Sequence, residues 1–319
     1  MSSIIRKKCV ITGEKLNKII DLGNFSLAND LQKKRKLSKT FNLSLTYSSK
    51  SKIVQINNIV DPKKLFKNYL WVTGTSKKIN EYKNNFFNIC NDYIKNSKKP
   101  KVLEIASNDG TFLEIFKQNN CEVLGVDPAK NLLKISNKKN INTLTEFYNF
   151  SLSKKINKKF GQFDLIYARN VIAHVKDINS FVKSINLNLK NEGIGCFEFH
   201  YLGEILKGLQ YDSIYHEHIY YFSLSSISVL LKKFNLYVFD CKRSPISGGS
   251  LIVFFSKDLR KKSKDYLKTV KFEKINKINN ISSFNHFASR CVNHKNYFHN
   301  IILKKIKNKK IVAYGASAR

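Results

Sequence analysis

The chain lacks several features that would place it in a membrane or outside the cell. Its apolar runs fall short of the roughly 18 residues that a membrane-spanning helix needs. The opening residues, MSSIIRKK, contain no apolar stretch long enough for a signal peptide. The six cysteines are widely spaced and include no Cys-x-x-Cys pair. These absences predict a cytoplasmic protein with reduced thiols.

Arginine is also scarce, and this weakens the meaning of the charge. The formal net charge is +34, but only seven of the 57 basic residues are arginine, and the lysines are spread among many Asn and Ile residues over the whole chain. An AT-rich coding sequence produces such a bias. Nucleic acid is therefore not the expected partner, and the positive field suits an anionic small substrate better. A length of 319 residues predicts two or three domains.

One stretch, KVLEIASNDG at residues 101–110, organises the chain. An apolar, β-branched run predicts a buried strand, the polar cluster after it predicts a tight turn, and the apolar periodicity from Phe112 to Phe116 predicts a helix. A second apolar strand then ends in Asp127, 23 positions beyond Glu104. An acidic residue at the end of the second strand is placed to bind ribose hydroxyls.

This arrangement resembles the S-adenosylmethionine site of the Rossmann-like class I methyltransferases. A dinucleotide-binding dehydrogenase is the rival, but its Gly-x-Gly-x-x-Gly fingerprint needs glycines where the chain has Ala106, Asn108 and Thr111. Further strands and helices alternate up to residue 255, which predicts an α/β fold with a mostly parallel sheet. Together, the motif and the resemblance imply cofactor contacts at Glu104, Ala106, Asn108, Asp109, Gly110, Asp127, Glu146, Phe147 and Asn170.

A more specific resemblance comes from the N-terminal residues and the segment after them. The phrase Asp-Leu-Gly-x-x-x-Leu-Ala-Asn at 21–29, followed by YLWVTGTS at 69–76, resembles the bacterial sugar C-methyltransferases of deoxysugar biosynthesis. The resemblance implies a small zinc-ribbon-like β domain at 1–66 and a methyltransferase domain at 67–255. It also implies the start of a second α/β domain, the C-terminal C-methyltransferase domain, at 256–319, where the chain looks truncated.

In that family two Cys-x-x-Cys pairs hold zinc in the N-terminal domain. Here the first pair falls on Cys9 and Thr12, and the second on Ser48 and Ser51. Neutral hydroxyls do not replace thiolates as structural zinc ligands. We therefore expect the domain to persist without the metal, held by hydrogen bonds and by docking on the next domain.

The residues expected to carry the chemistry lie in DSIYHEHIYYF at 212–222, which is too polar for a core helix and too aromatic for an idle loop. A His-x-His pair could instead bind a metal, but no third ligand has a recognisable spacing. Tyr215, Glu217 and His218 match the family motif Tyr-x-Glu-His. We assign His218 as the base, Tyr215 as the enolate stabiliser and Glu217 as the support, with His216 as the alternative base.

Methylation of carbon needs a carbon nucleophile, which a keto sugar provides once the proton beside the ketone is removed. A histidine with a pKa near neutrality suits that removal. The sequence thus predicts an S-adenosylmethionine-dependent C-methyltransferase (EC 2.1.1.-) acting on a nucleotide-activated keto-deoxysugar. An O- or N-methyltransferase of a small molecule or RNA, and a non-catalytic truncated remnant, remain alternatives. Substrate contacts are expected from Tyr69, Trp71, Thr73, Ser76, Glu198 and Tyr201.

Overall fold

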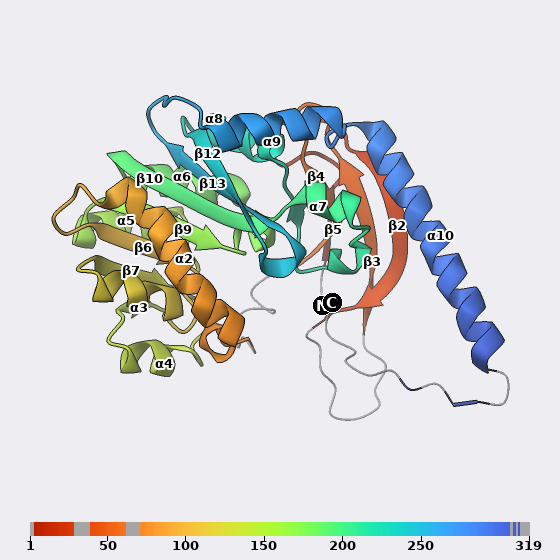
Figure 1. The fold of residues 1–319 in the computed structure, drawn as a ribbon, viewed down its shortest axis with the longest axis horizontal. Helices are drawn as coiled ribbons and strands as arrows, with labels where there is room; N and C mark the ends of the chain where they lie inside the picture. Colours follow the sequence, from red (N-terminus) through yellow and green to blue (C-terminus); the bar gives the residue numbers. More distant parts are fainter. Residues whose placement is uncertain (1–2, 29–38, 62–70, 307–308, 311, 313–319) are drawn as a thin grey trace.

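The computed structural model describes residues 3–28, 39–61, 71–306, 309–310 and 312 of the chain (Figure 1). Within these ranges a seven-stranded mixed sheet forms the larger part of the molecule, and two small antiparallel sheets of four and two strands form the smaller part. The predicted α/β class and the small N-terminal β unit are confirmed. Tyr69, to which we assigned a substrate contact, and residues 313–319 lie outside the described residues.

The large sheet has the strand order β12-β13-β10-β9-β6-β7-β8, and β13 is antiparallel to both of its neighbours. Apolar runs in the sequence predict strands at 141–145 and 194–199; the first is reduced to two residues in the structure, and the second is longer than predicted. The strands are β6 (Lys101–Ile105), β7 (Glu122–Val126), β8 (Thr143–Leu144), β9 (Phe163–Arg169), β10 (Leu189–His200), β12 (Tyr237–Ser244) and β13 (Ser250–Ser256).

Helices cover both faces of this sheet because successive side chains along its strands point to opposite faces, and each face carries an apolar core. Along β6, Val102 packs in the core that α2 and α3 cover, whereas Leu103 packs in the core that α5, α6 and α8 cover. The helices are α2 (Lys77–Ile94), α3 (Thr111–Gln118), α4 (Leu133–Lys138), α5 (Phe150–Phe160), α6 (Ile178–Asn188), α7 (Leu202–Lys207), α8 (Leu224–Lys232), α9 (Lys264–Ile275) and α10 (Ile281–Ile306).

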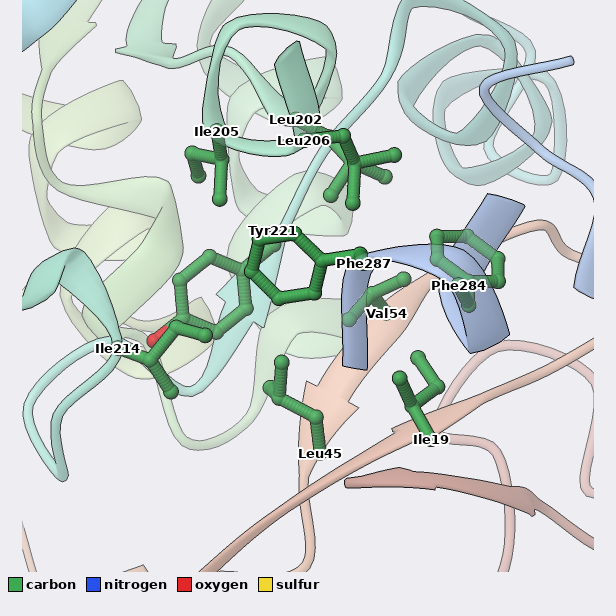
Figure 2. Close-up of a pocket in the computed structure, with 10 residues that line it drawn as sticks. All are labelled: Ile19, Leu45, Val54, Leu202, Ile205, Leu206, Ile214, Tyr221, Phe284 and Phe287. Atoms are coloured by element: carbon green, nitrogen blue, oxygen red, sulfur yellow. The ribbon is translucent and has the colours of Figure 1, made fainter. Parts of the chain in front are cut away.

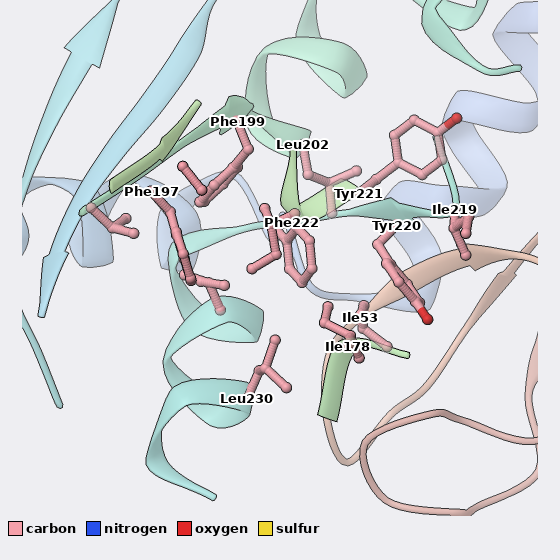
Figure 3. Close-up of a cluster of buried hydrophobic side chains, with 14 of the residues drawn as sticks. Ile53, Ile178, Phe197, Phe199, Leu202, Ile219, Tyr220, Tyr221, Phe222 and Leu230 are labelled. Carbon is pink, nitrogen blue, oxygen red and sulfur yellow. The ribbon is translucent and has the colours of Figure 1, made fainter. Parts of the chain in front are cut away.

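One strand of the N-terminal sheet comes from a segment of the larger part of the molecule. Its four-stranded sheet has the order β11-β4-β3-β2, and β11 (Tyr220–Tyr221) comes from the segment that carries the predicted catalytic residues. The other strands are β1 (Ser3–Ile5), β2 (Asn17–Ser26), β3 (Thr40–Tyr47), β4 (Val54–Ile56) and β5 (Asn58–Val60). Ile53 of this unit packs in the same core as Phe197 and Phe199 of the large sheet (Figure 3).

A second apolar contact joins the N-terminal unit to the end of the chain. Helix α10 runs beside β2 (Figure 1), and its Phe284 and Phe287 face α7 and the small sheet across a void of about 10 Å³ (Figure 2). The wall of this void is apolar, so the void is a packing gap between three elements rather than a binding site. In the described part of the chain, no helix combines the length and the apolar character that a membrane span requires.

Candidate active site

A cavity of about 850 Å³ lies at the carboxyl edge of the large sheet. It begins between β6 and β9, where the strand order reverses, which is the place where open α/β sheets bind their ligands. Its wall includes the turn after β6, the end of β7, the loop before α2, the turn η2 (Ile172–His174), and the segment 213–221. The volume is ample for a cofactor together with a second small substrate.

The turn after β6 has a left-handed backbone at alternate residues. The φ angles of Ala106, Asn108 and Gly110 are 59°, 52° and 74°. Only the third is a glycine, and a Cβ there would lie 3.2 Å from Ile141. The sequence lacks glycine at positions 106 and 108, which argued against a dinucleotide site. The backbone there nevertheless adopts the left-handed conformation that glycine favours. The antiparallel β13 is a firmer difference, because the dinucleotide-binding sheet is built from parallel strands.

Asp127 stands at the end of β7, on the wall of the cavity. Its two carboxylate oxygens accept hydrogen bonds from the backbone N–H groups of Asn108 and Ala129, both at 2.8 Å. Burial raises the pKa of this carboxyl group, while the two backbone donors oppose the rise. Each oxygen keeps a further lone pair, so the side chain is fixed in place and still able to accept from ribose hydroxyls.

The other predicted cofactor residues divide between the cavity and the surface. Glu104, Phe147 and Asn170 line the cavity, whereas Glu146 is exposed to solvent away from it. Burial raises the pKa of Glu104 to about 8, and its Oε2 atom has no hydrogen-bond partner among the described residues. A buried acceptor without a protein partner fits a site that a polar group of a ligand completes.

The loop before α2 contributes Trp71 and Thr73 to the cavity wall. Ser76, three residues after Thr73, is the N-cap of α2. Its side chain accepts a hydrogen bond from the Ile79 N–H. The side chains of Asn108 and Asp109 point towards this loop and bond to its backbone. We had assigned both residues to the cofactor, and that assignment stays a prediction. Asn108 lines the cavity, and its backbone N–H holds Asp127, while Asp109 contacts the loop.

Tyr215, Glu217 and His218 lie together on the opposite wall. The Tyr215 hydroxyl is 3.1 Å from Nε2 of His218, and the two ring centroids are 4.4 Å apart. His174 of η2 meets the His218 ring edge-on at 4.7 Å. Its Nδ1 lies 2.8 Å from the carbonyl oxygen of Glu217, and because a carbonyl only accepts, Nδ1 carries the hydrogen. Two histidines and a phenol therefore converge on the cavity.

His216, the alternative base, points the other way. Its ring is buried against the N-terminal unit, where Nε2 donates to the carbonyl of Phe41 over 3.2 Å and the Phe41 ring packs edge-on. Burial lowers the pKa of His216, which favours the neutral ring. Of the two predicted bases, only His218 lines the cavity in the described structure.

The N-terminal unit holds the segment that carries His218. β11 pairs with β4 in antiparallel register, and the Ile56 N–H donates to the carbonyl of Ile219 at 3.0 Å. On its other side, the Ile219 N–H donates to the carbonyl of Ala173 at 2.7 Å, next to His174. This short extended stretch thus joins the small sheet to η2 and fixes the distance between the two histidines.

Two predicted substrate residues are buried away from the cavity, as far as the described residues define it. Glu198 is fully buried, and it accepts from Arg169 (2.8 Å), from Tyr82 (2.7 Å) and from Ser244 (2.8 Å). Tyr201 is equally buried and donates to Glu273 of α9 at 2.9 Å. Both hold the framework behind the site.

Arg169 and Ser247 line the cavity without having been predicted as contacts. The guanidinium of Arg169 lies 3.4 Å from the centroid of the Phe112 ring, and its Nε donates to Glu198. A cation at the end of β9, in a chain with seven arginines, was the signal that could have identified it. Ser247 has a left-handed backbone (φ 56°).

The four positions that hold zinc in the family do converge here, but as a hydrogen-bonded cluster. The Sγ atom of Cys9 lies 3.1 Å from Oγ of Ser51, which bonds to Oγ of Ser48 at 2.6 Å, and Ser48 donates to the carboxylate of Glu14. The N–H of Thr12 faces the same sulfur. A donor set with one thiol and hydroxyls already bonded to one another does not fit structural zinc.

Comparisons with known proteins identify the family. Residues 80–240 match the family model described as a methyltransferase domain, and residues 245–319 match the C-methyltransferase C-terminal domain. The C-methyltransferase NovU of Streptomyces niveus is 31% identical over 214 residues, which are 67% of this chain and 51% of the relative. The chain therefore spans about half the length of that curated relative.

Among solved structures, the protein PH0226 of Pyrococcus horikoshii OT3 is 17% identical, with a TM-score of 0.45 over 62% of this chain and 96% of its own. The magnesium protoporphyrin IX methyltransferase ChlM of Synechocystis PCC 6803, solved with bound SAM, is 10% identical, with a TM-score of 0.41 over 55% of this chain and 78% of its own.

Proposed function

The chain belongs to the family of S-adenosylmethionine-dependent C-methyltransferases, and we propose that it methylates a carbon next to the ketone of a nucleotide-activated keto-deoxysugar. The observation that carries the proposal is the convergence of Tyr215, His218 and His174 on the cavity that the turn after β6 opens into. An acid–base cluster facing a cofactor site suits a reaction in which a proton must leave carbon before the methyl group arrives.

S-adenosylmethionine, when bound, supplies a methyl group on a sulfonium centre to the carbon nucleophile. Asp127 is placed to hold its ribose hydroxyls, and Phe147 offers an apolar face for its adenine. Ala106, Ser107 and Asn108 of the left-handed turn line the same end of the cavity. The unpartnered oxygen of Glu104 is an acceptor for a polar group at the same end of the cavity.

His218 and Tyr215 divide the proton chemistry. In the free protein the Tyr215 hydroxyl and Nε2 of His218 are hydrogen-bonded partners. We propose that a bound ketone takes over the Tyr215 O–H as its donor, which leaves a ring nitrogen of His218 to accept the proton from the neighbouring carbon. The electron pair of that C–H bond then moves towards the ketone oxygen, where the Tyr215 donor stabilises the enolate.

His174 and Glu217 keep the base in position. The His174 Nδ1–H bond to the carbonyl of Glu217 ties η2 to the turn that contains His218, and the edge-on ring contact restricts the His218 ring. The Glu217 side chain is buried on the cavity wall beside them, where it supports the same turn.

The first test is calorimetric titration of the purified protein with S-adenosylhomocysteine, followed by proton exchange in D₂O. Binding in the micromolar range, and deuterium uptake beside the ketone of a nucleotide keto-deoxysugar, are expected. Methyl transfer to oxygen or nitrogen without such exchange would overturn the carbon assignment. A folded protein that does not bind S-adenosylhomocysteine would overturn the methyltransferase activity itself and favour a non-catalytic module.

A further inference from the structure

The turn that follows β6 has two side chains that reach away from the cofactor end. Asn108 is 9% exposed and Asp109 only 2%. Asn108 occupies a position where a glycine-rich turn would offer backbone alone, so its side chain does something that glycine cannot do. The partners of the two side chains include the backbone of the loop before α2, the Thr111 hydroxyl and Lys139.

Asn108 binds the loop before α2 at two points. Its Oδ1 accepts from the N–H of Thr73 at 3.0 Å, and its Nδ2 donates to the carbonyl of Trp71, also at 3.0 Å. One amide thus satisfies a donor and an acceptor on alternate residues, as a neighbouring β-strand does. The backbone N–H of the same Asn108 donates to Asp127. This residue therefore connects the cofactor carboxylate to the loop.

Asp109 adds a second contact. Its Oδ2 accepts from the N–H of Gly74 at 3.0 Å, from the Thr111 hydroxyl at 2.9 Å and from Lys139 at 3.2 Å. The approach is so close that a Cβ on Gly74 would lie 2.6 Å from that oxygen and 2.7 Å from Oγ1 of Thr111. Glycine is needed at position 74 because the loop is pressed against the turn.

We propose that Asn108 and Asp109 are positioning residues that clamp residues Trp71–Gly74 onto the cofactor turn and so set the wall of the cavity that Trp71 and Thr73 form. This proposal deepens the methyltransferase function and rests on it for its purpose. Its geometry can be tested without turnover.

The chain has a single tryptophan, and it is Trp71. Its side chain is 52% exposed, so acrylamide quenching of the protein's tryptophan fluorescence reports on this loop alone. In Asn108→Gly the left-handed backbone is retained, since glycine adopts it freely, while both side-chain bonds to the loop are lost. We expect the quenching constant to rise at least twofold.

Gly74→Ala approaches the same contact from the other side, because its methyl group would push the loop off Asp109 without altering the turn. It should raise the quenching constant as well. Asn235→Gly is the matched control: Asn235 has the same left-handed backbone (φ 55°) in the exposed turn after α8, and the substitution should leave quenching unchanged.

Wild-type quenching in both Asn108→Gly and Gly74→Ala would overturn the clamp even if S-adenosylhomocysteine binds normally. Failure of the wild-type protein to bind S-adenosylhomocysteine would instead count against the proposed function, and the quenching comparison would still decide whether the clamp exists. If Asn108→Gly no longer binds S-adenosylhomocysteine, the quenching constant of Gly74→Ala alone decides whether the clamp exists.

Discussion

The two ends of the cavity are built in different ways. Most of the cofactor end comes from 24 consecutive residues, Glu104 to Asp127, in which a strand, a turn, a helix and a second strand follow one another, and Phe147 and Asn170 add to it. The acceptor end brings together η2, the segment 213–221 and, behind them, the N-terminal sheet. One end is therefore mainly a local structure that the β6–α3–β7 unit provides, whereas the other exists only when distant segments have docked.

The strand pairing that joins the segment 213–221 to the N-terminal sheet covers few residues. Only two residue pairs, Tyr220 with Gln55 and Tyr221 with Val54, define the β11–β4 ladder. The register is secured by burial, since Tyr220 and Tyr221 are 1–2% exposed and share one core with the large sheet. We therefore expect changes at the acceptor end to act on chemistry and assembly, and changes at the cofactor end to act on affinity.

The largest effect is expected at His218. His218→Asn removes the base and should lower proton exchange beside the ketone by about 10²–10⁴-fold, the usual contribution of a general base. Affinity for S-adenosylhomocysteine should stay within threefold, because the other end of the cavity is untouched. Exchange in D₂O and calorimetry measure the two quantities.

His216→Asn is the control for this change, because His216 is two residues away and buried against Phe41. It should lower thermal stability and keep the exchange rate within a few-fold. An exchange rate that falls as far as in His218→Asn would show that both histidines serve the acceptor end.

Asp127→Ala should have the opposite effect to His218→Asn: it should weaken cofactor binding and leave proton exchange intact. Losing a charged acceptor is worth roughly 1.5–3 kcal/mol, which corresponds to about a 10–150-fold weaker affinity for S-adenosylhomocysteine. Proton exchange, which needs only the acceptor end, should persist. Asp164→Ala, which alters a carboxylate at the amino edge of the sheet that binds the Lys101 N–H, serves as the control. Equal loss of affinity in both variants would mean that the effect is on folding rather than on the cofactor.

The hydroxyl cluster of the N-terminal unit tests how the acceptor end is supported. We expect the purified protein to contain far less than one equivalent of zinc. Ser48→Ala removes the hydroxyl that accepts from Ser51 and donates to Glu14, and should reduce the free energy of unfolding by about 1–3 kcal/mol. Thermal unfolding with and without a chelator measures this, and one tightly held equivalent of zinc in the wild-type protein would contradict it.

The triple variant Thr12→Cys, Ser48→Cys and Ser51→Cys sharpens the test. With Cys9 it recreates four thiols at positions that already converge. It should gain one equivalent of zinc and become sensitive to chelators.

A further effect, on stability rather than on turnover, concerns Glu104 and pH. Burial raises its pKa to about 8 in the folded protein, above the ordinary value near 4.5. A raised pKa means that the folded state binds the proton more tightly, so this contribution to stability is complete below pH 4.5 and is lost as the pH rises through 8. Glu104→Gln should flatten the fall in stability between these values, as measured by urea unfolding at several pH values. An unchanged slope would show that other groups cause it.

Much of the cofactor end could be predicted from sequence because its signals are local. Apolar runs, a polar turn and an acidic residue at a strand end define β6, α3, β7 and the place of Asp127 without reference to the rest of the chain. The pattern could not indicate that the Asn108 side chain would reach the loop at Trp71, since that contact joins segments 37 residues apart.

At the acceptor end the sequence showed which residue types are present, but not which way their side chains point. His216 and His218 are two positions apart, which in a strand would place them on one face. They diverge because the chain turns there, with the His218 N–H bonded to the carbonyl of Tyr215. Glu198 shows the same limit: its strand was predicted, but its burial depends on Arg169, Tyr82 and Ser244, which come from three other elements.

The sequence by itself determined the order of strands and helices, the glycine-poor cofactor turn and the residue types of the acid–base cluster, because each depends on short-range periodicity or on adjacent side chains. Tertiary structure decided which histidine faces the cavity, which carboxylates are buried in the framework and which strand completes the N-terminal sheet. Those outcomes depend on hydrogen bonds and burial between segments up to about 170 residues apart, and no local pattern records them.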